Sequence, residues 1–310
     1  MKSGVFTALG IDVGGTKIAA GVVEFPSGRV LVRRQIPTHP ERGGTALLED
    51  VRSLAIQITR ELELGTPPPL ALGIGLCELV SPAGQILSHH TLSWGTSDIL
   101  EHLGDLAPVT VEADVRAAAQ AEACFGVGRH LRSFLHLTIG TGIASCLMVE
   151  GRPHLGARGA TGTLASSPVT LPCECCGNLT GRTLEQLASG PGMVARYNAA
   201  GSGRALTAED VVEAARMGDP TARHVVETAG ESLGSVLAML ISVLDPEAVS
   251  ISGGLGLSEG PFWTALVSAT RRHTWSDVHR NLPILRAQTG TNAGLIGAAI
   301  AATAVRPPSN

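Results

Sequence analysis

Three glycine-rich segments have residue types and spacings that suit the binding of phosphate. The first, DVGGTK, runs from Asp12 to Lys17, and its consecutive glycines, Gly14 and Gly15, let the backbone approach an anion without a Cβ clash. Backbone N–H groups, the Thr16 hydroxyl and the Lys17 ammonium are donors, and Asp12 is placed to hold Mg²⁺ through water. The spacing is neither that of a P-loop nor that of a dinucleotide-binding turn. An ordinary hairpin turn is the alternative.

Two further segments repeat this combination of small residues and backbone donors. In the IGTG segment, the small residues Gly140, Thr141 and Gly142 each offer a backbone donor. The SGG segment lies between a predicted strand and a helical stretch, so the backbone at Gly253 and Gly254 can pass close to a nucleotide.

Asp114 is the strongest candidate for a general base. It follows the extended residues Val111 and Glu112 and begins an alanine-rich stretch, up to Phe125, that predicts a helix. A carboxylate at this place can take a proton from an attacking hydroxyl group. The alternative is that Asp114 serves only as the helix N-cap.

Apolar patterning predicts the elements that must position these residues. Apolar runs indicate strands over residues 5–13, 17–24, 29–36, 70–76, 109–112, 248–252 and 282–286, of which the first three form a meander. Helical spacing predicts helices over 46–64, 114–125, about 220–244 and the small-residue tail 290–305. Residues 134–149 predict a second hairpin, hinged at IGTG. Strands mixed with helices throughout indicate an α/β protein.

A weak internal repeat relates the first two glycine turns. GIDVGGTKIAAGVV aligns with HLTIGTGIASCLMV, so that Asp12 falls opposite Thr138 and Gly14 opposite Gly140. Each copy is a strand, a glycine-rich turn and a strand, and two such halves indicate a duplicated fold with a cleft between them. A chance likeness of two glycine-hinged hairpins is the alternative.

Composition argues against several classes of protein. The 310 residues suggest about two domains, and 44% apolar residues suit a globular chain. A formal net charge of -4 argues against binding to nucleic acid or to anionic membranes. The longest apolar stretch, residues 233–244, is too short to span a bilayer. Because we find no signal peptide, the six cysteines argue against a disulfide scaffold and favour the cytoplasm.

Taken together, the motifs resemble the nucleotide site of the actin-like sugar kinases and, more narrowly, the ROK family (repressors, open reading frames and kinases), which includes bacterial glucokinases. The resemblance covers nearly the whole chain, through LGIDVGGTKIAAGVV, VEADVRAAAQAEACFGVGR, LTIGTGIASCLMVEGR, LEQLASGP, DPEAVSISGG and GLIGAAI. It implies an actin-like ATPase (ribonuclease H-like) fold of two α/β domains, with ATP, Mg²⁺ and a sugar-like substrate in the interdomain cleft. It also implies a homodimer.

The same resemblance implies domain ranges and a catalytic residue. We expect a smaller domain of residues 1–112 with a C-terminal helix at about 291–310, and a larger domain of residues 113–290. ROK kinases carry an Asn-Asp-x-Asn signature whose Asp is the base, which implies that Asp114 is catalytic. ROK repressors have a winged-helix region ahead of the first motif. Because DVGGTK begins at Asp12, we expect no DNA binding.

Several neighbouring positions depart from the family pattern. The two Asn residues of the signature are Ala113 and Arg116 here. In the family's Gly-Glu-x-x-His segment, which contacts sugar hydroxyls, Thr163 replaces the Glu and Ser166 replaces the His. The second substrate Glu is retained as Glu185.

These departures favour an altered acceptor. Another carboxylate, Glu78, stands in GIGLCELVSP where many members have Gly, and we expect it to touch the acceptor with Thr163 and Glu185. A solvated loop charge is the alternative for Glu78. Losing hydrogen-bonding groups weakens the recognition of glucose. We therefore expect a kinase for a primary hydroxyl of an amino sugar or a sugar-like C7-cyclitol. The alternatives are a glucokinase with a rearranged pocket and a non-catalytic sugar-binding regulator.

The zinc site of the family is also altered. It uses the His that Ser166 replaces and three cysteines, for which the CECC segment offers Cys173, Cys175 and Cys176. Thr183 stands where the last cysteine would align. Adjacent cysteines strain a shared tetrahedral ion, so free thiols are the alternative to zinc.

Overall fold

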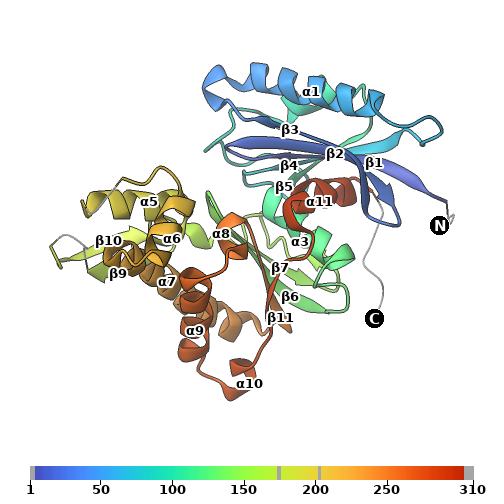
Figure 1. Cartoon of the computed structure of the whole chain (residues 1–310). Helices are drawn as coiled ribbons and strands as arrows, with labels where there is room; N and C mark the ends of the chain where they lie inside the picture. Colours follow the sequence, from blue (N-terminus) through green and yellow to red (C-terminus); the bar gives the residue numbers. More distant parts are fainter. Residues whose placement is uncertain (1–3, 173–175, 202–203, 304–310) are drawn as a thin grey trace. The chain divides into compact units, whose positions relative to one another are not determined.

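The computed structural model describes residues 4–172, 176–201 and 204–303, and internal contacts divide the chain into two compact units (Figure 1). The first unit comprises Met1–Arg132, Cys146–Thr161 and Gln288–Asn310, and the second comprises Ser133–Ser145 and Gly162–Ala287. The helix that begins at Asp114 therefore belongs to the first unit. The domain ranges inferred from the family resemblance stay a prediction.

A five-stranded sheet of order β3–β2–β1–β4–β5 forms the centre of the first unit. Its strands are β1 (Phe6–Val13), β2 (Lys17–Phe25), β3 (Arg29–Pro37), β4 (Pro69–Leu76) and β5 (Val109–Ala113). β2 pairs antiparallel with β1 and β3, which confirms the predicted meander, whereas β1, β4 and β5 are parallel. The carboxyl ends of these three strands therefore lie at one edge, where Asp12 is level with Gly75 and Gly75 with Glu112.

Helices cover both faces of this sheet (Figure 1). α1 (Gly44–Arg60) packs on β2 and β3, next to α2 (Thr96–Leu103) and after the short helix η1 (Pro40–Arg42). The predicted helix over 46–64 is confirmed, but it ends at Arg60, ahead of Gly65 with its positive φ. On the opposite face lie α3 (Asp114–Phe125) and, after η3 (Gly290–Asn292), the tail helix α11 (Ala293–Ala301).

α11 packs backbone against backbone on its neighbours. A Cβ on Gly10 of β1 or on Gly73 of β4 would lie 1.8 Å from a carbonyl oxygen of α11. A Cβ on Gly297 of α11 would lie 1.7 Å from the carbonyl oxygen of Ala117 in α3. No side chain tolerates such distances, so only glycine fits these places. The small residues of the tail are therefore a packing requirement.

Three parallel strands, in the order β12–β11–β6, form the core sheet of the second unit. They are β6 (Ser133–Ile139), β11 (Ala248–Ser252) and β12 (Ile284–Arg286). β6 continues through IGTG into β7 (Ile143–Val149), within which the chain returns to the first unit, and the end of β7 pairs with β8 (Arg152–Pro153).

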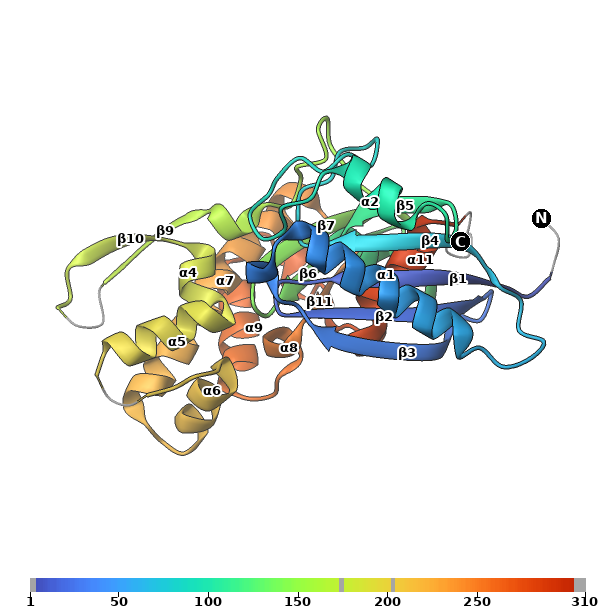
Figure 2. The same cartoon turned by 90° about the horizontal axis from the view of Figure 1, so that it is seen from above.

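The remaining elements of the second unit are helical, apart from one hairpin. The hairpin of β9 (Pro168–Pro172) and β10 (Leu179–Thr183), preceded by η2 (Leu164–Ser166), leads into α4 (Leu184–Ala188), as Figure 2 shows. The helices that follow are α5 (Gly190–Ala199), α6 (Ala208–Arg216), α7 (Pro220–Leu244), α8 (Gly254–Leu257), α9 (Pro261–His273) and α10 (Asp277–Arg280).

α7 is long and apolar enough to cross a membrane by length and hydropathy alone, but it packs as a core helix. In the most apolar 18-residue stretch of α7, 56% of the stretch is buried inside the protein. Asp219 caps its first turn by accepting a hydrogen bond from the Ala222 N–H. Gly230 and Gly234 let α9 approach closely, since a Cβ on either would lie within 2.7 Å of a carbonyl oxygen of α9.

Gly297→Ala should destabilise the first unit. The added methyl group would overlap the Ala117 carbonyl oxygen, so α11 must move away from α3. Overpacking of this kind costs about 3 kcal/mol or more, and we expect the melting temperature to fall by at least about 5 °C. Gly181→Ala is the control, because a Cβ there meets nothing within 4 Å. Equal melting temperatures for the two variants in differential scanning calorimetry would contradict this account of α11.

Candidate active site

Two carboxylates of the first unit lie at the carboxyl edge of its parallel strands. Asp12 is the next-to-last residue of β1, and Asp114 is the first residue of α3, directly after β5. Gly75 of β4 is level with Asp12, and a Cβ placed on it would lie 3.7 Å from the Cα of Asp114. The parallel strand ends thus bring together two acidic residues that are about a hundred positions apart in the sequence.

Desolvation raises the pKa of both carboxyl groups. Surrounding protein raises the pKa of Asp114 from 3.8 to about 7, the negative charge of Asp12 adds to this, and the Val115 N–H and Arg116 oppose it in part. Desolvation likewise raises the pKa of Asp12 to about 6, against the charges of Lys17 and Arg33. A carboxyl group with a pKa near 7 can accept and release a proton at neutral pH, which is what a general base requires.

Asp114 is not the N-cap of α3. Ala113 holds that position, without a side-chain cap, and the Asp114 carboxylate accepts a hydrogen bond from the Val115 N–H, with 2.6 Å between N and Oδ1. The capping alternative is therefore wrong. That Asp114 is a base stays a prediction at this point.

Thr38, the residue that follows β3, braces the DVGGTK turn, and the side-chain donors of the turn are exposed. The Gly14 N–H donates to the Lys17 carbonyl oxygen at 3.0 Å, and the Thr38 hydroxyl donates to the Gly14 carbonyl oxygen at 2.7 Å. The side chains of Thr16 and Lys17 are exposed. Neither glycine of the turn has a positive φ, so they act by lacking a side chain rather than by unusual conformation.

α11 closes the other side of Asp12. A Cβ on Gly294, in the first turn of α11, would lie 2.2 Å from Asp12 Oδ2, so the carboxylate rests against the helix backbone. The partial positive charge of a helix N-terminus favours an ionised carboxylate there. Sequence reasoning missed this contact, although the glycines of GLIGAAI were its visible signal.

Glu78 is a buried carboxylate whose oxygens hold the loop that follows it. Oε1 accepts hydrogen bonds from the N–H groups of Thr91 and Leu92, at 2.6 and 2.9 Å. Oε2 accepts hydrogen bonds from the Ser88 hydroxyl and the His90 N–H, at 2.5 and 3.0 Å. Burial alone would raise the pKa of Glu78, but these four donors outweigh it and hold the pKa below its usual range. The solvated-charge alternative is therefore wrong, while contact with an acceptor stays a prediction.

The IGTG turn of the second unit is braced from behind by LEQLASGP. The Gly190 N–H, at the start of α5, donates to the Gly140 carbonyl oxygen at 2.8 Å. The Ile143 N–H donates to Glu185 Oε2 at 3.0 Å. Glu185 thus holds the phosphate-type turn in addition to its predicted contact with a sugar. The sequence contained both motifs but gave no sign that they touch.

A chain of hydroxyl groups that the motif search missed supports the same turn and the SGG segment. His136 is fully buried in β6, and its ring nitrogens lie 3.2 Å from Ser250 Oγ and 3.0 Å from Ser252 Oγ. Ser252 Oγ lies 3.0 Å from Thr138 Oγ1, so this series of hydrogen bonds reaches the next-to-last residue of β6 and the last residue of β11. Alternate polar residues in two otherwise apolar strands were the signal. Gly253, the residue that follows Ser252 in the sequence, has φ +85° and lies against the Ile139 backbone.

The positions altered relative to the sugar-contact and zinc patterns have local roles. Thr163 is exposed and precedes η2, and the Ser166 hydroxyl donates to the Thr163 carbonyl oxygen. Thr183 is the N-cap of α4 and accepts the Gln186 N–H. Cys173 and Cys175 lie outside the described residues, and Cys176 is exposed with a free thiol. Within the described ranges, acidic, His and Cys side chains form no cluster of three that could hold a metal.

Comparison with known proteins gives consistent matches over nearly the whole chain. The sequence pattern of the ROK family matches residues 8–305. The bifunctional enzyme NanE/NanK of Brucella melitensis is 32% identical over 95% of this chain, and the chain spans about half, 54%, of that protein's length. The N-acetylgalactosamine kinase AgaK of a Shewanella species is 28% identical, with 94% of this chain and 95% of that one covered.

A solved structure with the same fold carries ligands. It is a ROK family glucokinase from Streptomyces griseus in complex with glucose and AMPPNP. It is 27% identical to this chain, with a TM-score of 0.80, and the match covers 96% of this chain and 99% of that one.

Asp114→Asn should stabilise the protein at pH 8. Because the folded pKa of about 7 exceeds the ordinary 3.8, the folded chain keeps this proton between those pH values while the unfolded chain loses it, so ionisation costs stability as pH rises. The uncharged amide avoids that cost. We expect a gain of roughly 2–4 kcal/mol in the free energy of unfolding at pH 8, vanishing below about pH 4.

Chemical denaturation at several pH values measures this gain. Asp277→Asn is the matched control, because Asp277 is the first residue of α10 and its side chain is 88% exposed. It should lose slightly in stability, since a helix N-terminus favours a carboxylate. A destabilised Asp114→Asn variant at pH 8 would contradict this prediction, because it would show that the ionised Asp114 side chain stabilises the fold.

Proposed function

The chain belongs to the ROK family, and from this membership we propose that it is an ATP-dependent kinase that transfers a phosphoryl group to a primary hydroxyl of a hexose-like substrate. The expected actin-like α/β fold is confirmed by its likeness to the S. griseus glucokinase. One observation carries the proposal beyond the family: Asp114 lies beside Asp12 at the edge where β1, β4 and β5 end, and desolvation there raises its pKa to about 7.

In the proposed mechanism, the hydroxyl oxygen of the acceptor attacks the γ-phosphorus of ATP, the bond from that phosphorus to the bridging oxygen of ADP breaks, and Asp114 accepts the proton of the hydroxyl group. Oδ1 is occupied by the Val115 N–H, which leaves Oδ2 for this task. The nearby charge of Asp12 makes Asp114 more basic than an ordinary carboxylate. The charge of Asp12 favours proton transfer from an alcohol, which is a weak acid, while the hydrogen bond from the Val115 N–H opposes it in part.

The glycine turns fit the phosphates of ATP. In the first unit, Gly14 to Lys17 offer outward donors and a cation, and Asp12 would hold Mg²⁺ through water. In the second unit, we assign phosphate contacts to Gly140, Thr141 and Gly142, and adenosine contacts to Gly253 and Gly254. When bound, ATP would supply the phosphoryl group, and Mg²⁺ would neutralise the charge that develops on that group during transfer.

For the acceptor, we propose an amino sugar or a sugar-like cyclitol. Ala113, Thr163 and Ser166 replace groups that bind hexose hydroxyls in the family, while the candidate base and the glycine turns are intact. The relative named an N-acetylgalactosamine kinase supports the amino-sugar class. Since the Glu78 oxygens already accept four hydrogen bonds, an N-acetyl group is an easier neighbour for this loop than a free ammonium.

A glucokinase is the second candidate, because the S. griseus relative was solved with glucose. A sugar-binding regulator without catalysis is the third. A homodimer in the cytoplasm, without nucleic-acid or membrane partners, is proposed from the family resemblance and the composition. Zinc enters no step of the mechanism.

An acceptor panel tests the substrate class. With Mg-ATP, we expect turnover on an N-acetylated amino sugar or a C7-cyclitol to exceed that on glucose by at least about tenfold in kcat/KM. ADP release with and without each acceptor measures it and subtracts background ATP hydrolysis. Glucose as the best substrate would instead establish the glucokinase alternative.

Asp114→Asn tests the catalytic assignment. The variant should lose about 10²- to 10⁴-fold in kcat, because it cannot accept the proton, while its affinity for ATP changes little. Isothermal titration with AMPPNP checks that affinity, and Asp277→Asn again serves as the control with unchanged turnover. Undiminished turnover by Asp114→Asn would remove Asp114 from the mechanism.

A further inference from the structure

Arg116 is a buried cation two residues beyond the candidate base. It stands at the second Asn position of the Asn-Asp-x-Asn signature, and only 4% of its surface is exposed. A guanidinium so deep in the protein must be paired and hydrogen-bonded, or its burial would cost several kcal/mol. Its partners therefore show what the replacement of Asn by Arg achieves.

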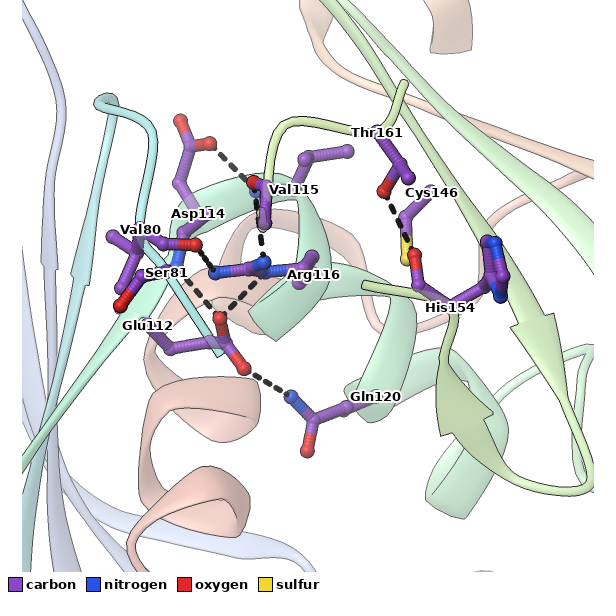
Figure 3. A network of polar contacts seen from close by, with 12 residues as sticks. Val80, Ser81, Glu112, Asp114, Val115, Arg116, Gln120, Cys146, His154 and Thr161 are labelled. Carbon is purple, nitrogen blue, oxygen red and sulfur yellow. Dashed lines mark hydrogen bonds and ion pairs between the residues drawn. The ribbon is translucent and has the colours of Figure 1, made fainter. Parts of the chain in front are cut away.

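The Arg116 guanidinium has one ionic partner and two backbone partners, most of which Figure 3 shows. Its Nε lies 2.6 Å from Glu112 Oε1. One terminal nitrogen donates to the Val80 carbonyl oxygen at 2.7 Å, and the other donates more weakly to the Gly159 carbonyl oxygen at 3.5 Å. The fork thus spans two chain segments that are almost eighty residues apart in sequence.

Glu112 is held on its own side of the pair. Its Oε1 also accepts the Ala113 N–H at 2.9 Å, and its Oε2 accepts the Gln120 amide at 3.3 Å (Figure 3). These bonds tie the counter-charge to the last residue of β5 and to the second turn of α3. The ion pair therefore encloses the strand-to-helix junction at which Asp114 lies.

The two segments that Arg116 bridges are in direct backbone contact. Gly159 has φ +78°, and a Cβ on it would lie 2.2 Å from the Val80 carbonyl oxygen and 2.8 Å from the Cα of Ser81. Both carbonyl oxygens accept hydrogen bonds from Arg116, which pairs two backbone acceptors at this close contact. The Val80 segment directly follows Cys77 and Glu78 of GIGLCELVSP, where the chain departs from the family pattern.

We propose that Arg116, with Glu112 as its counter-charge, is a positioning residue that clamps the segment at Val80 to the turn at Gly159 and so fixes the acceptor beside Asp114. An arginine is needed because its planar fork reaches two carbonyl oxygens and one carboxylate at once, which a lysine cannot do. The inference rests on the proposed kinase function. It assigns the role to the bridge between segments and not to the ion pair as such.

Three variants separate the bridge from the ion pair. Arg116→Met removes the bridge and leaves Glu112 buried without a cation, so it should lose both stability and acceptor recognition. The double variant Glu112→Gln/Arg116→Met leaves no unpaired charge and should recover most of the melting temperature that Arg116→Met loses. Arg116→Lys keeps the charge pair but not the fork.

For these variants we expect the acceptor kinetics not to follow stability. The double variant and Arg116→Lys should keep an acceptor KM raised by about tenfold or more, with the KM for ATP within about twofold of the wild type. Arg52→Met is the matched control, because Arg52 likewise joins a carboxylate, Asp105, to the His102 carbonyl oxygen, away from the site. It should leave both KM values unchanged. Recovery of the acceptor KM together with the melting temperature would overturn the proposal and leave a plain buried ion pair.

Hydrogen exchange measures the clamp without any catalysis. The Gly159 N–H, which donates to the Leu155 carbonyl oxygen, should exchange at least about tenfold faster in the double variant than in the wild type, and Arg52→Met should match the wild type. Unchanged exchange would overturn the clamp even if the kinase activity is real. If the wild type turns over no acceptor but the exchange result holds, the kinase function fails while the bridge between the segments stands.

Discussion

Two carboxylates, Asp12 and Asp114, lie close together where the parallel strands β1, β4 and β5 end, and the surrounding elements of the first unit hold them there. Desolvation raises the pKa of both Asp12 and Asp114, and the charge of Asp12 raises the pKa of Asp114 further. A sheet can impose such proximity because parallel strands end at the same edge, so Asp12 near the end of β1 and Asp114 directly after β5 lie on either side of the end of β4. The glycine at position 75 then keeps a side chain from filling the space between.

The helices around this edge lower the free-energy cost of ionising the two carboxylates without neutralising their charge. α3 and α11 both begin here, so each directs the partial positive charge of its N-terminus to one carboxylate. α11 can reach Asp12 because Gly10 and Gly73 let the helix backbone touch the backbone of the sheet, and because Gly294 leaves room for the Asp12 carboxylate against the helix. α11 therefore contributes to the electrostatics of the site. The ionisation of Asp12 depends on the same small residues that let α11 pack closely.

The sequence predicted what local patterns determine. Buried strands appeared as apolar runs, the glycine turns stood out by composition, and Asp114 followed a strand that led directly into a helix. It could not predict contacts whose partners come from distant segments. The donors to Glu78 lie ten to fourteen residues further on, and the two partner strands of the hydroxyl chain at His136 are 114 residues apart. Arg116 was recognised as a departure from a motif. Its partners, however, include backbone carbonyl oxygens, and every residue has one, so the sequence cannot show which of them Arg116 contacts.

The two glycine hairpins that align in the sequence carry different side chains at matching strand positions. In the first unit, Asp12 of β1 is level with Gly75 of β4, while at the matching place in the second unit Thr138 of β6 is level with Ser252 of β11. A carboxylate beside a glycine has thus been replaced by two hydroxyl groups that bond to each other. A second carboxylate there would repel phosphate, whereas hydroxyl groups and the backbone donors that follow attract it. Under the proposed function, the strand ends of the first unit would handle a cation and a proton next to the phosphate donors of Gly14 to Lys17, whereas those of the second unit would only hold phosphate.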